Sequence, residues 1–287
     1  MHIISGQLKY EIHFQEYKND ENQIEIVKVF FGPRKHHCVV VSVYLDESDP
    51  DYVFAELEGI GYKSLCSTNG SLPRGHGTID MLKSAMAFIF TEYQFLQGIK
   101  LKDTSSIDCG KGKNLDLLSF EMAKRGVSWY SFHFNAHCET HKDQKMINNL
   151  PQKMNNAFLK YKGNFNQFYT KYIIKHKSDD IFMRTETKPL LKHVFDGSST
   201  FSQFINNVIK TDGLKCEALL YWLNDYVHKL GSFESEMHWI IDRPQILHHI
   251  TIDRSQQGGN VTTLTKKTIK QIWKNIDNNG RKKQLIG

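Results

Sequence analysis

The sequence lacks a paired-cysteine motif. Its five cysteines are Cys38, Cys66, Cys109, Cys138 and Cys216. Their number is odd, they are scattered over the chain, and no two have the CxxC spacing. This pattern is typical of reduced thiols in an intracellular protein rather than of a disulfide framework. We therefore predict free cysteines.

Long apolar runs are also missing. No segment approaches the about 20 continuous apolar residues that a membrane span requires. The amino terminus has no basic stretch followed by an apolar run, so no secretory signal is predicted. These absences predict a soluble, cytoplasmic protein without a membrane contact.

Acidic residues are scarce in one part of the chain, its carboxyl-terminal end. The net charge is +6 over 287 residues, and the hydrophobic share of 40% is that of an ordinary globular protein. Near the carboxyl terminus only Asp277 opposes a basic group made of Lys266, Lys267, Lys270, Lys274, Arg281, Lys282 and Lys283. Two interpretations stay open: a solvated helix and tail, or a weak contact with nucleic acid or another acidic partner.

The first third of the chain has the two-residue period of β-strands. Apolar residues occupy every second position in 7–17, and 23–31 and 38–45 are rich in β-branched residues. A further strand is expected over 52–62, after an acidic turn. Together these segments predict an antiparallel meander.

The period then changes to that of a helix. After a glycine turn, apolar residues recur at three- and four-residue spacing over 79–93. A short strand over 99–104, a helix over 115–124 that ends before Gly126, and a strand over 127–134 are expected next. We predict that residues 72–136 form one α/β unit.

The second half is expected to be mainly helical. Helices are predicted over 146–161, 165–176, 201–210, 217–229 and 263–276, with a strand over 246–253. The predicted domains are 1–141 and 142–287, the second ending in the basic tail. The fold class is α/β (α+β), a mixed sheet with flanking helices and a helical extension.

The glycine turn has a physical use. Its residues Gly75, His76, Gly77 and Thr78 open the helix, where backbone N–H groups are unpaired and the helix dipole is positive. Such a helix start binds anions, and Arg74 adds a positive charge beside it. The other interpretation of the turn is plain packing.

The order of these elements resembles the GNAT family of N-acetyltransferases, over roughly residues 1–140. The resemblance implies that the turn binds the pyrophosphate of acetyl-CoA through backbone amides. The implied cofactor-binding residues are Arg74, Gly75, His76, Gly77, Thr78 and Asn114. Segments 101–109, 126–130 and 134–136 also resemble GNAT-like proteins encoded by large DNA viruses, which implies a location in the host cytoplasm or the virion.

Two positions depart from the family pattern. Leu72 stands where the family has Gln or Arg, and Met122 stands where its Tyr protonates the departing thiolate. Glu56 and Glu58 are the candidate bases on the strand before the turn, and Tyr130 is a candidate acid. Two functions stay open: an acetyl-CoA-dependent N-acetyltransferase acting on a protein or small amine, or a catalytically degenerate structural or interaction protein, such as a virion component.

A histidine-rich segment is a further candidate, for zinc. His133, His137, Cys138 and His141 have suitable spacing, but His133 belongs to a predicted strand and no second pair of ligands lies nearby in the sequence. No metal site is predicted.

Overall fold

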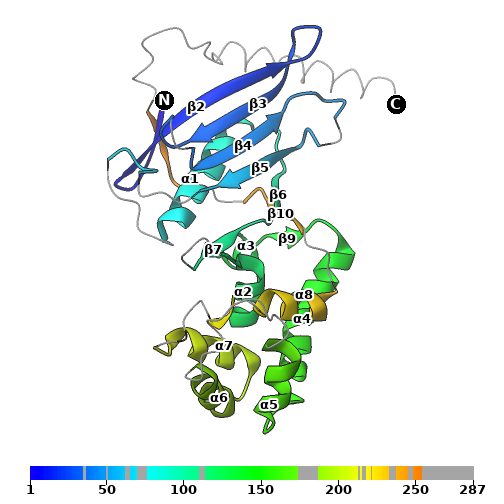
Figure 1. The fold of residues 1–287 in the computed structure, drawn as a ribbon. Helices are drawn as coiled ribbons and strands as arrows, with labels where there is room; N and C mark the ends of the chain where they lie inside the picture. Colours follow the sequence, from blue (N-terminus) through cyan, green and yellow to red (C-terminus); the bar gives the residue numbers. More distant parts are fainter. Residues whose placement is uncertain are drawn as a thin grey trace.

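The chain forms a mixed α/β fold with one large sheet and a mainly helical region, shown in a computed structural model (Figure 1). The residues that the structure describes are 1–34, 37–49, 51–61, 65–69, 76–109, 114–173, 187–212, 214, 218–220, 222–232, 237–244 and 248–253. The predicted basic helix over 263–276 and its tail lie outside these residues.

Nine of the described strands form one open sheet. In spatial order they are β11 (Thr251–Asp253), β1 (His2–Ser5), β2 (Leu8–Lys18), β3 (Ile24–Phe31), β4 (Val39–Tyr44), β5 (Phe54–Ile60), β6 (Gly98–Lys102), β10 (His238–Asp242) and β9 (His137–Cys138). Neighbouring strands are antiparallel except β5 and β6, which are parallel. A separate pair, β7 (Ser106–Asp108) and β8 (Asn114–Asp116), follows β6 in the chain.

The predicted meander is confirmed as β2 to β5. Side chains alternate between the faces of a strand, and β3 shows the result. Val27, Val29 and Phe31 are almost fully buried, whereas Lys28 lies on the opposite face and pairs there with Glu58. The sheet therefore has one apolar face and one polar face.

Helix α1 (His76–Glu92) covers the apolar face, and the helix predicted over 79–93 is confirmed. Leu82 and Phe88 are fully buried, and the Phe88 ring lies 5.8 Å from that of Phe31 and 6.2 Å from that of Phe14. Parallel strands need such a crossover connection, so α1 is the element that brings β5 and β6 side by side.

The helix predicted over 115–124 is also confirmed, as α2 (Leu117–Arg125). Asp116 caps its amino terminus, and Gly126 ends it with φ of 79°, a left-handed conformation that glycine adopts without strain. The strand predicted over 127–134 is wrong, because α3 (Trp129–Phe134) lies there. The Ser128 side chain accepts a hydrogen bond from the Ser131 amide, which starts a helix in spite of the alternating pattern.

Residues 141–231 are largely helical, as expected. The described helices are α4 (His141–Leu159), α5 (Phe165–Phe168), a π-helical turn (Tyr169–Ile173), α6 (Thr187–Gly197), α7 (Phe201–Lys210) and α8 (Leu223–Gly231). Their aromatic side chains pack together: the Phe158 ring lies 4.8 Å from that of Phe195 and 5.6 Å from that of Phe204. In the part of the chain that the structure describes, no helix is long and apolar enough to cross a membrane.

The sheet takes strands from both halves of the chain. β10 pairs with β6, and β11 pairs with β1 at the opposite edge. The strand predicted over 246–253 is present as β11, whereas β10 and β9 were not expected. Because β10 pairs with both β6 and β9, the helical region begins and ends against the sheet.

The prediction of free cysteines is wrong. Cys38 and Cys66 form a disulfide with a Cα–Cα distance of 5.9 Å, Cys109 is also disulfide-bonded, and Cys138 is a buried free thiol. Sequence spacing does not measure spatial distance: the chain after β5 returns to the start of β4, where the Gly61 amide donates to the Cys38 carbonyl at 2.7 Å. Since disulfides persist in oxidising environments, cysteine usage no longer supports a cytoplasmic location.

We predict that the Cys38→Ala/Cys66→Ala double variant is less stable than the parent chain. The bond closes a loop with a sequence separation of 28, and the loss of this restraint on the unfolded chain corresponds to about 3.5 kcal/mol. Urea denaturation followed by tryptophan fluorescence measures the change, with Cys138→Ala as the control that removes a buried sulfur without a cross-link. Alkylation of Cys38 and Cys66 in denaturant without reductant is the result that contradicts the disulfide.

Candidate functional site

The parallel strands β5 and β6 separate at their carboxyl ends. They pair from Phe54 opposite Gly98 to Leu57 opposite Leu101, and no further. β5 continues to Ile60 against β4 alone, and Glu58 has no partner in the β4 register. Such a bulge bends a strand. The pairing therefore ends at Leu57 and Leu101: β5 continues to Ile60, whereas β6 ends at Lys102.

Helix α1 follows β5 in the chain after residues 61–75, of which 61 and 65–69 are described. His76, Gly77 and Thr78 form its first turn, which contains no acidic residue, and Gly77 is buried. Arg74 and Gly75 lie outside the described residues. The first-turn N–H groups suit an anion; the predicted pyrophosphate contact itself stays a prediction.

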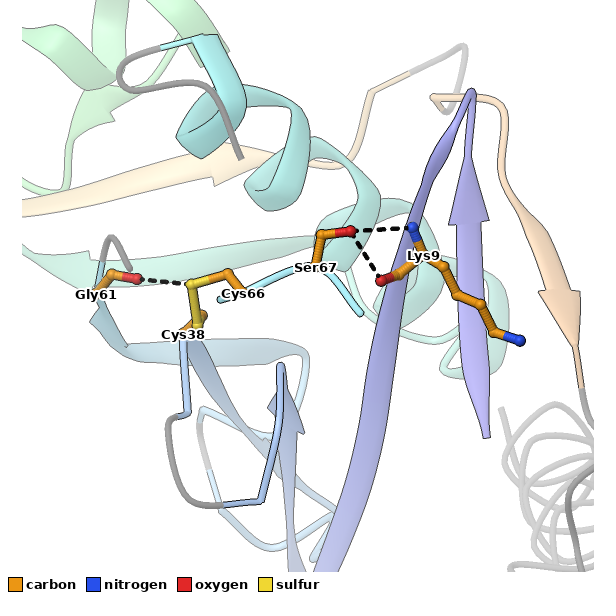
Figure 2. The surroundings of a disulfide bond; sticks show 5 residues. All are labelled: Lys9, Cys38, Gly61, Cys66 and Ser67. Atoms are coloured by element: carbon orange, nitrogen blue, oxygen red, sulfur yellow. Dashed lines mark hydrogen bonds between the residues drawn. A yellow bond between two sulfur atoms is a disulfide. The ribbon is translucent and has the colours of Figure 1, made fainter. Parts of the chain in front are cut away.

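The segment that leads toward this turn is held on two sides (Figure 2). Cys66 is bonded to Cys38 at the start of β4. On the other side, the Thr68 amide donates to the Lys9 carbonyl at 2.8 Å and the Lys9 amide donates to Asn69 Oδ1 at 2.7 Å. Ser67 Oγ also contacts the Lys9 backbone. Residues 66–69 are thus fixed to both β4 and β2.

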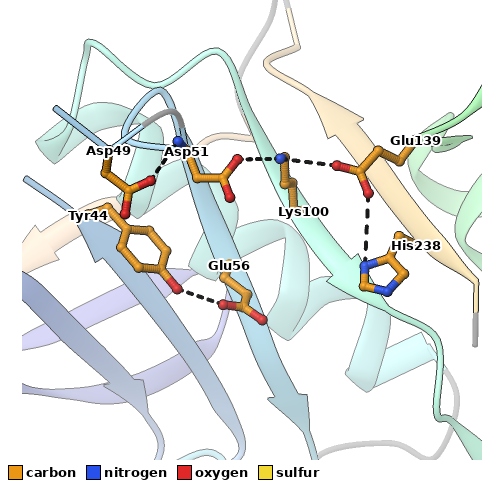
Figure 3. A network of polar contacts seen from close by, with 7 residues as sticks. All are labelled: Tyr44, Asp49, Asp51, Glu56, Lys100, Glu139 and His238. Carbon is orange, nitrogen blue, oxygen red and sulfur yellow. Dashed lines mark hydrogen bonds and ion pairs between the residues drawn. The ribbon is translucent and has the colours of Figure 1, made fainter. Parts of the chain in front are cut away.

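Glu56 and Glu58 both lie on the polar face of the sheet and both have partners. Tyr44 Oη donates to Glu56 at 2.8 Å (Figure 3). Glu58 pairs with Lys28 at 2.7 Å and accepts from Ser42 Oγ at 2.5 Å. Burial raises the pKa of Glu58, but the bonds from Lys28 and Ser42 outweigh it and leave the pKa below its usual value. Glu58 is therefore a weak base where it stands.

Ion pairs on the same face hold β6 to its neighbours (Figure 3). Lys100 Nζ lies 2.5 Å from Asp51 and 3.1 Å from Glu139, and Glu139 also lies 3.9 Å from His238 Nδ1. Lys100 stands opposite Glu56, inside the paired part of β5 and β6. These contacts join β6 to the residue Asp51 that precedes β5 and to the residue Glu139 that follows β9.

A buried acid, Asp103, stands at the carboxyl end of β6. Its amide donates to the Met237 carbonyl at 3.1 Å, and its Oδ1 accepts from the Ser105 amide at 3.2 Å and from Ser105 Oγ. Its Oδ2 is buried and has no hydrogen-bond partner, although only 8% of the residue is exposed. Burial raises the pKa of Asp103 to about 6; the Ser105 bonds lower it and repulsion from Asp116 raises it.

Tyr130 joins this cluster from α3. It is 4% exposed, and burial, followed by the charge of Asp103, raises the pKa of its hydroxyl, while a hydrogen bond with Ser105 acts in the opposite direction. The phenol therefore stays protonated at neutral pH. Of the predicted site residues that the structure describes, Tyr130 alone is placed in this group, which we call the Asp103 cluster: Asp103, Ser105 and Tyr130.

The Asp103 cluster is linked to the helical region. Asp116 accepts from the Ser119 amide at the start of α2 and lies 3.1 Å from His228 of α8. Asn114, a predicted cofactor residue, is exposed on β8 opposite Asp108. Met122, where the family has its thiolate acid, is 1% exposed in α2. In the described parts of the chain, no group of three His, Cys, Asp or Glu side chains could hold a metal ion.

Asp103 was missed by sequence reasoning, although a signal exists. Ligands in open α/β sheets bind outside the carboxyl ends of parallel strands, and Asp103 directly follows β6. Its burial could not be read from the sequence, because Met237 and Tyr130 come from distant segments. A carboxyl with a raised pKa in such a place is typical of functional sites.

We predict that Asp103→Asn is more stable than the parent at pH 8, by up to about 3 kcal/mol. The ordinary pKa of 3.8 rises to about 6 in the folded chain, so ionisation above that range penalises the folded state. The advantage of the variant falls as the pH drops from about 7 to about 4, where Asp103 is protonated. Urea denaturation at several pH values measures it, with Asp242→Asn on exposed β10 as the matched control; an advantage independent of pH contradicts the assignment.

Comparisons with protein-family models, with curated proteins and with solved structures find no match to this chain. The function is therefore argued from the chemistry of the site.

Proposed function

We propose that this chain is a GNAT-like protein that binds acetyl-CoA and transfers its acetyl group to an amine of a protein or small molecule. The observation that carries the proposal is the parallel pair β5 and β6, whose pairing ends at Leu57 and Leu101 and which α1 connects. An extended ligand fits between two strand edges that have ceased to bond to each other, since it can pair with the exposed backbone groups.

The start of helix α1 is a suitable binding site for the phosphates of the ligand. The first turn of α1 offers unpaired N–H groups and no acidic side chain, and Gly77 brings no side chain toward a ligand. The disulfide and the Lys9 contacts fix residues 66–69, which precede this turn in the chain.

The candidate catalytic residues depart from the pattern of the GNAT family. Met122 has no proton to donate and is buried, while Glu58 is held by Lys28. These two observations favour the second function, a catalytically degenerate structural or interaction module. The Asp103 cluster favours the first, because it supplies an acid and a hydroxyl at the end of β6.

Acetyl-CoA binding is tested by isothermal titration calorimetry on the full chain. We expect heat with the parent and at least about a tenfold loss of affinity in Gly77→Glu, because a carboxylate at the helix start repels the pyrophosphate. The matched control is Thr91→Glu, which adds the same charge on the exposed carboxyl-terminal turn of α1. Absence of heat at millimolar acetyl-CoA contradicts both the transferase and the cofactor-binding role.

The two functions are separated by a thiol-release assay. We expect release of free CoA thiol from acetyl-CoA to depend on added primary amine if the chain is a transferase. Acetyl-CoA that binds but yields no amine-dependent thiol identifies the degenerate module instead. A no-protein blank corrects for spontaneous hydrolysis.

A further inference from the structure

Positive charge is concentrated in the helical region rather than spread over the chain. Residues 141–231 contain 14 Lys and Arg but 8 Asp and Glu, a net charge of +6. Residues 1–140 contain 14 Lys and Arg but 18 Asp and Glu, a net charge of −4. A folded chain with such an uneven distribution has a positive field over one region of its surface, which attracts acidic partners.

Helix α4 is amphipathic, and its outward face is basic. Its buried residues Ile147, Leu150, Met154 and Phe158 recur at three- and four-residue spacing, on the side that packs against α2, α7 and α8 (Figure 1). The residues on the opposite side are exposed lysines and amides. We call this surface the α4 lysine face; it consists of Lys142, Lys145, Asn149, Gln152, Lys153, Asn156 and Lys160.

The α4 lysine face has no negative charge to balance it. Asp143 is the only acidic residue of α4, and it accepts a hydrogen bond from Thr140 Oγ1 at 2.6 Å at the start of the helix. Lys142, Lys145 and Lys160 form no ion pair with another described residue. Exposed helix faces commonly pair lysines with carboxylates three or four residues away. A face of one sign therefore suits a partner that supplies the opposite charge.

Two of these lysines stand where they reduce the stability of the helix. Lys142 and Lys145 lie in the first two turns of α4, at the positive end of the helix dipole, where acidic residues are favoured and basic residues are not. Departures from a local rule of this kind are expected at functional sites. The dipole also attracts a negatively charged partner to this end of the face.

The composition of the face selects among acidic partners. Lysine contacts phosphate as a point charge, and amide side chains donate hydrogen bonds to phosphate oxygens. Single-stranded nucleic acid is held by aromatic side chains on which bases stack, and protein interfaces depend on aromatic or arginine anchors and are depleted in lysine. The α4 lysine face contains neither aromatic residues nor arginine, so it suits the backbone of a duplex.

We propose that the α4 lysine face binds the phosphate backbone of duplex DNA without regard to base sequence. From Lys142 to Lys160 the helix rises about 27 Å, which is the axial length of about eight base pairs. Each lysine neutralises one phosphate and releases its counterion, so affinity falls as salt rises. The interaction needs neither acetyl-CoA nor the Asp103 cluster and is independent of the proposed function.

The proposal is tested with a fluorescein-labelled DNA duplex of about 24 base pairs, whose anisotropy is followed as the full chain is added at salt concentrations from about 50 to about 200 mM. The test variant combines Lys142→Gln, Lys145→Gln, Lys153→Gln and Lys160→Gln. We expect it to bind at least about tenfold more weakly than the parent at the lowest salt. The slope of log affinity against log salt should become less steep by about 3.6, or about 0.9 for each lost phosphate contact.

The matched control removes the same charge from other parts of the chain. It combines Lys18→Gln, Lys83→Gln, Lys188→Gln and Lys210→Gln, on β2, α1, α6 and α7, and none of these lysines is buried. The control should keep most of the affinity and slope of the parent. The basic residues near the carboxyl terminus are unchanged in both variants, so their contribution is equal.

The test variant is expected to fold. Glutamine has nearly the helix propensity of lysine, and the variant loses two charges that oppose the helix dipole, so its urea midpoint should be no lower than that of the parent. Loss of binding is then not loss of structure.

Several results would overturn the proposal. An unchanged salt slope in the test variant places the binding elsewhere in the chain, and an equal fall in both variants makes it an effect of net charge. No binding of the duplex by the parent at the lowest salt leaves α4 a solvated surface. Single-stranded DNA or polyglutamate bound as tightly as the duplex assigns the face to another class of partner.

Discussion

The pairing of β5 with β6 is the constraint on which the rest of the structure depends. The two strands are parallel, so they need the α1 crossover, and α1 supplies the core of the apolar face. Their bonding ends at Leu57 and Leu101, one position after Lys100, which pairs with Asp51 and Glu139.

The helical region is joined to this part of the sheet rather than standing apart from it. Strand β10 returns from residues 238–242 to pair with β6, and Asp116 joins the start of α2 to His228 of α8. Tyr130 reaches the Asp103 cluster from α3. The cluster thus costs stability, through the burial of Asp103, at a place held by three separate segments. Such a cost persists where the surrounding structure over-determines the geometry, and it is typical of functional sites.

Much of the fold could be predicted from local sequence patterns, whereas the candidate site depends on contacts between distant segments of the chain. The period of α1 and the Gly126 end of α2 could be read from the sequence because helix faces and caps are local. Residues 127–134 carry both an alternating pattern and a serine cap, and the cap prevailed. The Cys38–Cys66 bond and the burial of Asp103 depend on contacts across the fold, which spacing along the chain does not reveal.

Hydrogen exchange of the backbone amides with and without acetyl-CoA tests the central claim most directly, because it reports where the cofactor lies. We expect added protection in the separated part of β5, residues 58–60, and in the first turn of α1, with little change elsewhere. A contrary result is protection confined to the helical region, for example at the hollow of about 250 Å³ between α6 and α7 that His193, Asn207 and Lys210 help to line. That pattern would place the ligand away from the β5–β6 pair.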